Sequence, residues 1–139
     1  MKSLIVLSLL LSACGKAPEI NVDPDIEIYF QKFTQDTGKE VKDISAMFNP
    51  MARPTIAMCI FMGDTRRIEV DRTYWDESSD DDREQIIYHE LGHCALYRGH
   101  NNALNQYKCQ ASIMHQYIFA ESPCYKMNKL YYFQELVGG

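Results

Sequence analysis

Three of the four histidines lie between Ile86 and His100, a segment that reads IIYHELGHCALYRGH. Positions four apart on an α-helix lie on one face about one turn apart, so His89 and His93 can present two imidazole nitrogens to one ion. Glu90 lies beside this pair, where a carboxylate can take a proton from a water at the open position of a zinc site. The pattern His-Glu-x-x-His therefore predicts a catalytic Zn²⁺ site with His89 and His93 as ligands and Glu90 as general base.

A third ligand is expected further along the chain. On a continuous helix His100 would lie about 16 Å along the axis from His89, whereas a zinc–nitrogen bond is about 2 Å long. Ligation by His100 therefore requires the helix to end soon after His93 and the chain to fold back. Gly99 is the residue expected to take the left-handed turn, and His115 is the alternative third ligand.

The composition limits the class of protein. The chain has 139 residues, of which 46% are hydrophobic, which is enough for one modest core. Its formal net charge is −5 and lysine and arginine do not cluster, which argues against a nucleic-acid partner because phosphate binding needs a basic face. Acidic residues gather between positions 76 and 84, where we expect a solvated loop. No feature indicates an oligomeric state.

The N-terminus has the form of an export signal. Lys2 precedes an apolar run over residues 3–11, which is too short to span a bilayer, and Leu11-Ser12-Ala13-Cys14 follows. This order resembles a bacterial lipoprotein signal peptide, in which residues 1–13 are removed and Cys14 becomes the acylated N-terminus. An ordinary secretory signal with an incidental cysteine is the alternative.

The lipoprotein resemblance implies a protein anchored in the bacterial cell envelope that touches the membrane only through the lipid on Cys14. Gly15 at the next position favours the outer membrane, by resemblance to the sorting rule of Gram-negative lipoproteins. Residues 14–23 are expected to tether a single domain, residues 24–139, to this anchor.

Export to an oxidising compartment permits disulfides among the other cysteines. These form an even set with three possible connectivities and no C-x-x-C spacing of a zinc knuckle: Cys59, Cys94, Cys109 and Cys124. The favoured pair is Cys109 with Cys124, which would close a short loop around residues 112–115. Small buried thiols are the alternative.

The spacing of apolar residues predicts an α+β fold. Asp23 is the expected cap of the first helix and Gly38 its stop, Gly63-Asp64 a hairpin turn, and Ser79 with Asp82 a capping box. The predicted elements are helices over about residues 24–36, 80–98 and 125–136 and strands over about residues 41–48, 55–62 and 67–71. Together they predict a small antiparallel or mixed sheet of about three strands packed on the long histidine-bearing helix, with an N-terminal and a C-terminal helix.

A second motif lies downstream of the helix. Ser112-Ile113-Met114-His115 and the helix together resemble the metzincin zinc metallopeptidases. In that resemblance His100 matches the third histidine and residues 112–115 match the Met-turn, which places Met114 beneath the metal. Tyr117 is similar to the tyrosine that approaches zinc in astacins, one residue displaced, and is a candidate oxyanion donor; a packed aromatic is the alternative.

The sequence departs from the metzincin pattern at the end of the helix. The family pattern is H-E-x-x-H-x-x-G-x-x-H, whereas Leu96 stands at the glycine position here and His100 comes one residue late, after Gly99. The turn is therefore expected to differ from the family's.

The resemblance implies a metallopeptidase that hydrolyses peptide bonds in a peptide or protein substrate. It implies zinc held by His89, His93 and His100, Glu90 as general base, and an antiparallel edge strand that aligns the substrate. Two alternatives share the envelope location: a hydrolase of peptidoglycan cross-links, and a non-catalytic surface lipoprotein with a structural zinc site.

Overall fold

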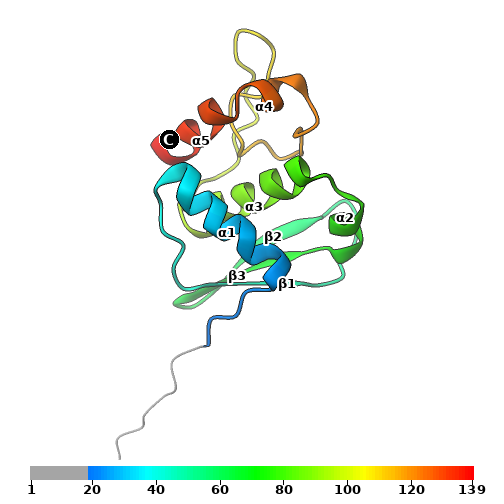
Figure 1. Ribbon diagram of the computed structural model, residues 1–139, viewed down its shortest axis with the longest axis vertical. Helices are drawn as coiled ribbons and strands as arrows, with labels where there is room; N and C mark the ends of the chain where they lie inside the picture. Colours follow the sequence, from blue (N-terminus) through cyan, green and yellow to red (C-terminus); the bar gives the residue numbers. More distant parts are fainter. Residues whose placement is uncertain (1–18) are drawn as a thin grey trace, which may run out of the picture.

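The computed structural model describes residues 19–139, and their helices and strands form the predicted α+β fold (Figure 1). The expected signal peptide over residues 1–13 and the expected lipidation site, Cys14, lie outside the described residues. In chain order the elements are α1 (Pro24–Thr37), β1 (Ile44–Phe48), β2 (Ala57–Met62), β3 (Thr65–Val70), α2 (Arg72–Glu77), α3 (Asp80–Cys94), α4 (Pro123–Met127) and α5 (Lys129–Gly138).

The three strands form one mixed sheet in the order β1-β3-β2. β1 runs parallel to β3, and β2 runs antiparallel to it through the predicted hairpin. Gly63 adopts a φ of 62° in that turn, a conformation that glycine reaches without strain. Within residues 19–139, β2 pairs only with β3, so it is an edge strand.

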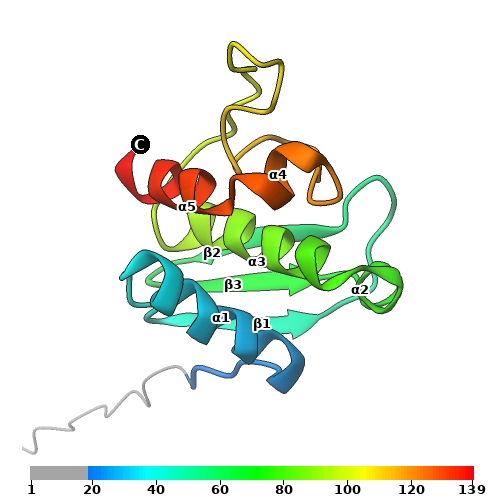
Figure 2. The same ribbon diagram turned by 45° about the horizontal axis from the view of Figure 1, so that its top comes forward.

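Helix α3 is the centre of the molecule. It packs on the sheet, with α1 alongside, while α4 and α5 lie on the side of α3 away from the sheet (Figure 2). The predicted core positions Ile87, Leu91 and Cys94 are fully buried. Because α3 is covered on several sides, it also buries polar side chains, and each of these needs a partner.

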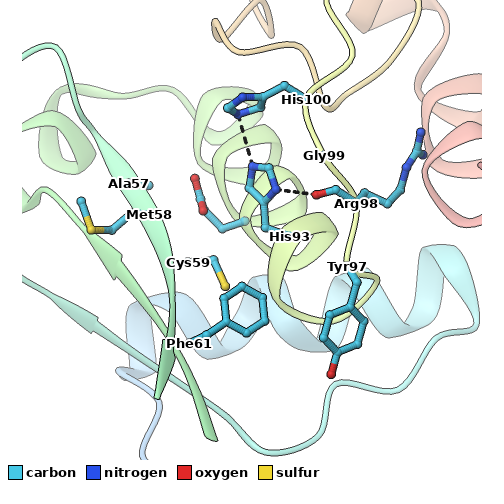
Figure 3. A pocket seen from close by; sticks show the side chains of 10 residues that line it. Ala57, Met58, Cys59, Phe61, His93, Tyr97, Arg98, Gly99 and His100 are labelled. Carbon is cyan, nitrogen blue, oxygen red and sulfur yellow. Dashed lines mark hydrogen bonds between the residues drawn. The ribbon is translucent and has the colours of Figure 1, made fainter. Parts of the chain in front are cut away.

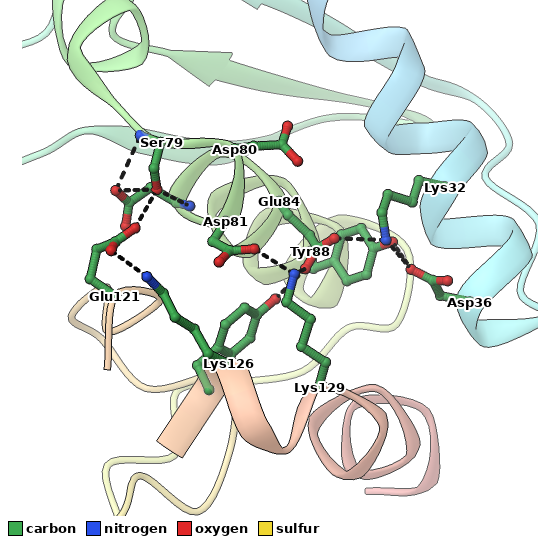
Figure 4. A network of polar contacts seen from close by, with 12 residues as sticks. Lys32, Asp36, Ser79, Asp80, Asp81, Glu84, Tyr88, Glu121, Lys126 and Lys129 are labelled. Atoms are coloured by element: carbon green, nitrogen blue, oxygen red, sulfur yellow. Dashed lines mark hydrogen bonds and ion pairs between the residues drawn. The ribbon is translucent and has the colours of Figure 1, made fainter. Parts of the chain in front are cut away.

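One buried charge network joins the helices around α3. The Glu84 side chain is 1% exposed, lies 2.7 Å from Lys32 Nζ of α1 and 2.8 Å from Lys129 Nζ of α5, and accepts a hydrogen bond from Tyr125 of α4 (Figure 4). Two lysines and a hydroxyl thus compensate the desolvation of the carboxylate. The expectation of a solvated acidic loop is therefore wrong for Glu84, because these partners come from distant parts of the chain.

The helix starts follow the predicted signals more closely than the helix ends. Asp23 caps α1, Gly38 closes it with a φ of 70°, and Ser79 with Asp82 forms the capping box of α3. However, α3 ends at Cys94 rather than at Arg98. The predicted last helix is interrupted at Asn128 and becomes α4 and α5, and the short helix α2 lies in a stretch for which no helix was predicted.

Two disulfides reinforce this arrangement. The favoured pair, Cys109 with Cys124, is confirmed, and the remaining cysteines, Cys59 and Cys94, form the other bond. The second bond ties the edge strand β2 to the last residue of α3. The end of the histidine-bearing helix is thereby fixed against the strand beside it.

Candidate metal centre

Three histidines meet at one point beside α3. His89 and His93 lie one turn apart on the helix, and His100 returns to them from the segment that follows. The three Nε2 atoms are 3.1 Å apart for His89 and His93 and 3.2 Å apart for each pair that includes His100. The structure therefore brings His100 to the pair, whereas His115 is not part of this cluster of described residues.

The chain reversal that delivers His100 differs from the prediction. Gly99 does not take the left-handed conformation; Tyr97 does, with a φ of 56°. The Arg66 guanidinium of β3 stabilises this turn, because it donates to Cys94 O at 2.7 Å and to the Tyr97 hydroxyl at 3.0 Å. The Arg98 N–H also donates to Gly92 O at 2.9 Å, so the reversal follows directly on the helix end.

Backbone carbonyls set the orientation of two of the rings. His89 Nδ1 donates to Ile113 O at 3.0 Å, and His93 Nδ1 donates to Arg98 O at 2.6 Å. Figure 3 shows the Arg98 carbonyl on one side of the His93 ring and His100 on the other. Because a carbonyl only accepts, both Nδ1 atoms carry the proton, and in a neutral ring each Nε2 then presents a lone pair.

Burial keeps these rings neutral. It lowers the pKa of His89 to about 4 and also lowers that of His93. The two Nε2 lone pairs consequently face each other across 3.1 Å. Two such lone pairs repel unless a cation lies between them, and neutral imidazole is a common metal ligand.

The spacing of the nitrogens fits a single ion. A triangle with edges of 3.1 to 3.2 Å has corners about 1.8 Å from its centre, slightly less than a zinc–nitrogen bond of about 2.0–2.1 Å. All three nitrogens can therefore reach one ion of that size. The cluster has three protein donors, the number found in catalytic sites that keep one position open.

The Glu90 carboxylate lies next to the cluster without joining it. Glu90 is 6% exposed, and its Oε2 atom has no hydrogen-bond partner among residues 19–139. Burial raises the pKa of Glu90 to about 8. A hydrogen bond from the backbone of Cys59 lowers this pKa, but its effect is smaller than that of burial. At neutral pH this group is therefore mostly protonated, and a cation held by the three histidines would lower its pKa and leave it ionised, as a proton acceptor must be.

Met114 explains the glycine inside the helix. A methyl group added at Gly92 would lie 2.3 Å from the Met114 sulfur and 3.1 Å from Leu136 of α5. The predicted close packing at Gly92 is thus present. Met114 is fully buried, and the Ser112 hydroxyl accepts a hydrogen bond from its N–H at 3.0 Å, which fixes the turn around it.

Two cavities flank the histidines. One, of about 510 Å³, is lined by Glu90, His93 and His100 together with side chains of β2 and of the reversal. The other, of about 370 Å³, is lined by Glu90, His89 and His100 together with Tyr117. Tyr117 is 67% exposed, so it is not a packed core residue.

Sequence reasoning missed the groups that orient the histidines. No motif marks a backbone carbonyl as an acceptor, so Ile113 and Arg98 carried no signal of their own. The only hint was position: Ile113 directly precedes Met114, and Arg98 lies between the motif and His100.

Comparisons of the chain with protein-family models, with curated proteins and with solved structures find no match.

Proposed function

We propose that the protein is a zinc-dependent metalloendopeptidase similar to the metzincins. One observation carries the proposal: three imidazole nitrogens converge beside a buried carboxyl group whose Oε2 atom has no hydrogen-bond partner among the described residues. A structural zinc site has four protein ligands and no need of such a carboxylate. The combination of three nitrogen donors and one adjacent acid is typical of hydrolysis.

Zinc is the ion that suits these donors best. Neutral imidazole binds several transition metals, but three imidazoles with an open position are a recurrent zinc arrangement. When bound, zinc supplies Lewis-acid polarisation of a carbonyl and lowers the pKa of a water.

The residues of the chain would then divide the proton transfers. The Glu90 carboxylate accepts a proton from the attacking water, while the water oxygen forms a bond to the scissile carbonyl carbon. When the carbon–nitrogen bond breaks, Glu90 passes the proton to the leaving amine. Tyr117, which lines the same cavity, is the candidate donor to the developing oxyanion.

The edge of the sheet supports an extended peptide as substrate. β2 contributes to both cavities, and its outer edge offers backbone groups that an added strand can pair with. Because the cavities continue on both sides of Glu90 and His100, a chain can extend in both directions from the reacting bond. Cleavage within a chain is therefore favoured over removal of terminal residues.

We also propose the envelope location. The structure contains two disulfides, and disulfides form and persist in oxidising compartments such as the cell envelope. Among the helices of residues 19–139, none is long and apolar enough to cross a membrane. Mass spectrometry of the mature N-terminus tests the anchor: an acylated Cys14 is expected, and an unmodified cysteine at that position would contradict it.

A peptide-library digest tests the proposed activity. The purified protein should cleave internal peptide bonds, lose this activity after treatment with a chelator, and regain it on addition of Zn²⁺. The same samples are incubated with peptidoglycan fragments. Cleavage of cross-links alone would replace the proposal with a cell-wall hydrolase, and cleavage that persists in the chelated protein would overturn it.

A further inference from the structure

A single carboxylate of the last helix contacts both segments that surround the histidines. Glu135 of α5 lies 2.7 Å from Arg98 Nη2 through Oε1, and its Oε2 accepts a hydrogen bond from Ser112 at 2.6 Å. Arg98 also donates to the carbonyls of Glu135 and Leu136, at 2.7 and 3.0 Å. Arg98 and Glu135 are 14% and 19% exposed, so water screens this pair only partly.

Each partner of Glu135 is linked to one histidine. Arg98 carries the carbonyl that accepts from His93 Nδ1. Ser112 is followed directly by Ile113, which carries the carbonyl that accepts from His89 Nδ1. The two acceptors thus belong to segments that meet at one side chain of α5.

The next residue of α5 packs beneath the same site. Leu136 is fully buried, and its Cδ1 atom would lie 3.1 Å from a methyl group at Gly92, on the helix turn between His89 and His93. α5 therefore approaches the histidines through a charged residue and an apolar residue in succession.

We propose that Glu135 is a positioning residue of the metal centre. It holds Arg98 and Ser112 in place. The carbonyls of Arg98 and Ile113 then keep the His93 and His89 rings oriented with Nε2 toward the ion. Groups that orient metal ligands from the outer shell usually matter about 10- to 100-fold in metal affinity. Glu135 does not contact the histidines itself but acts through Arg98 and Ser112. We therefore expect an effect at the lower end of that range, about tenfold.

This inference shares the three-histidine site with the proposed function but does not depend on hydrolysis. A protein that binds zinc as described and cleaves nothing would contradict the proposed function and leave the role of Glu135 unaffected. The readout is therefore metal binding rather than activity.

The test compares two variants of the same helix. Glu135→Ala removes the contacts to both histidine-bearing segments. Lys129→Ala is the matched control, because Lys129 ties α5 to α3 through Asp81 and Glu84, at 2.5 and 2.8 Å, and touches neither segment. The affinity for Zn²⁺ is measured by competition with a chelator, the Co²⁺-loaded forms are compared by visible absorption, and stability is measured by urea denaturation.

The expected result separates an effect on the orientation of the metal ligands from an effect on the stability of the fold. Both variants lose stability, but only Glu135→Ala weakens zinc binding by about tenfold and changes the Co²⁺ spectrum. Wild-type affinity in Glu135→Ala, or equal weakening in both variants, would overturn the proposal. If Glu135→Ala does not fold, Glu135→Gln decides the matter, because an amide has one acceptor oxygen and cannot accept from Arg98 and Ser112 at once, while the bond from Met114 N–H to Ser112 stays intact. Weaker zinc binding supports the role of Glu135, and unchanged binding overturns it.

Discussion

Replacement of Glu90 by glutamine is expected to abolish peptide hydrolysis while the metal stays bound. The amide has nearly the shape of the carboxylate but cannot accept a proton at neutral pH. General acid–base groups contribute about 10²- to 10⁴-fold to a rate, so the turnover number should fall by that factor. Metal content should not change, because Glu90 lies outside the cluster of three nitrogens.

The control for this variant is another buried carboxylate of the same helix. Glu84→Gln also removes a buried negative charge from α3, but Glu84 bonds Lys32, Lys129 and Tyr125 rather than facing the histidines. It should lower stability and leave hydrolysis per folded molecule intact. Wild-type turnover in Glu90→Gln would rule out Glu90 as the base.

Replacement of His100 by alanine is expected to remove most of the metal affinity. His100 Nε2 lies 3.2 Å from both of the other Nε2 atoms, so its loss leaves two nitrogen donors from the protein. Outer-shell changes alone cost about 10- to 100-fold in affinity, and loss of a direct ligand should exceed about 100-fold. Chelator competition with Zn²⁺ measures the effect.

His115→Ala is the matched comparison, because the sequence alone left both histidines open as third ligand. The His115 ring lies against Tyr117 and Phe119 and is not one of the three clustered histidines. Its replacement should leave zinc affinity within about twofold of wild type, since no direct or orienting contact is lost. If His100→Ala bound zinc as tightly as the wild type and His115→Ala bound it more weakly, His115 rather than His100 would be the third ligand.

Local signals were sufficient for the parts of the fold that depend on neighbouring residues. The capping box at Ser79, the left-handed stop at Gly38 and the hairpin at Gly63 each involve residues a few positions apart, and all three are present. The pairing of His89 with His93 follows from helix periodicity in the same way.

Features that depend on distant contacts were not predictable from local patterns. α3 ends at Cys94 where Arg66, a residue of β3, binds the last carbonyl of the helix and supports Tyr97 in a left-handed conformation. That support explains how a tyrosine can take the place expected for Gly99. The burial of Glu84 likewise depends on lysines from α1 and α5, about fifty positions away in each direction.

The metal content of the purified wild-type protein shows whether the three histidines hold an ion. After dialysis against metal-free buffer, the protein should retain about one zinc ion per chain, as expected for a single site with three protein ligands. The His89→Ala variant, prepared in parallel, should retain none. A folded wild-type protein that contains no metal and takes up no Zn²⁺ when it is supplied would rule out a metal centre at these histidines.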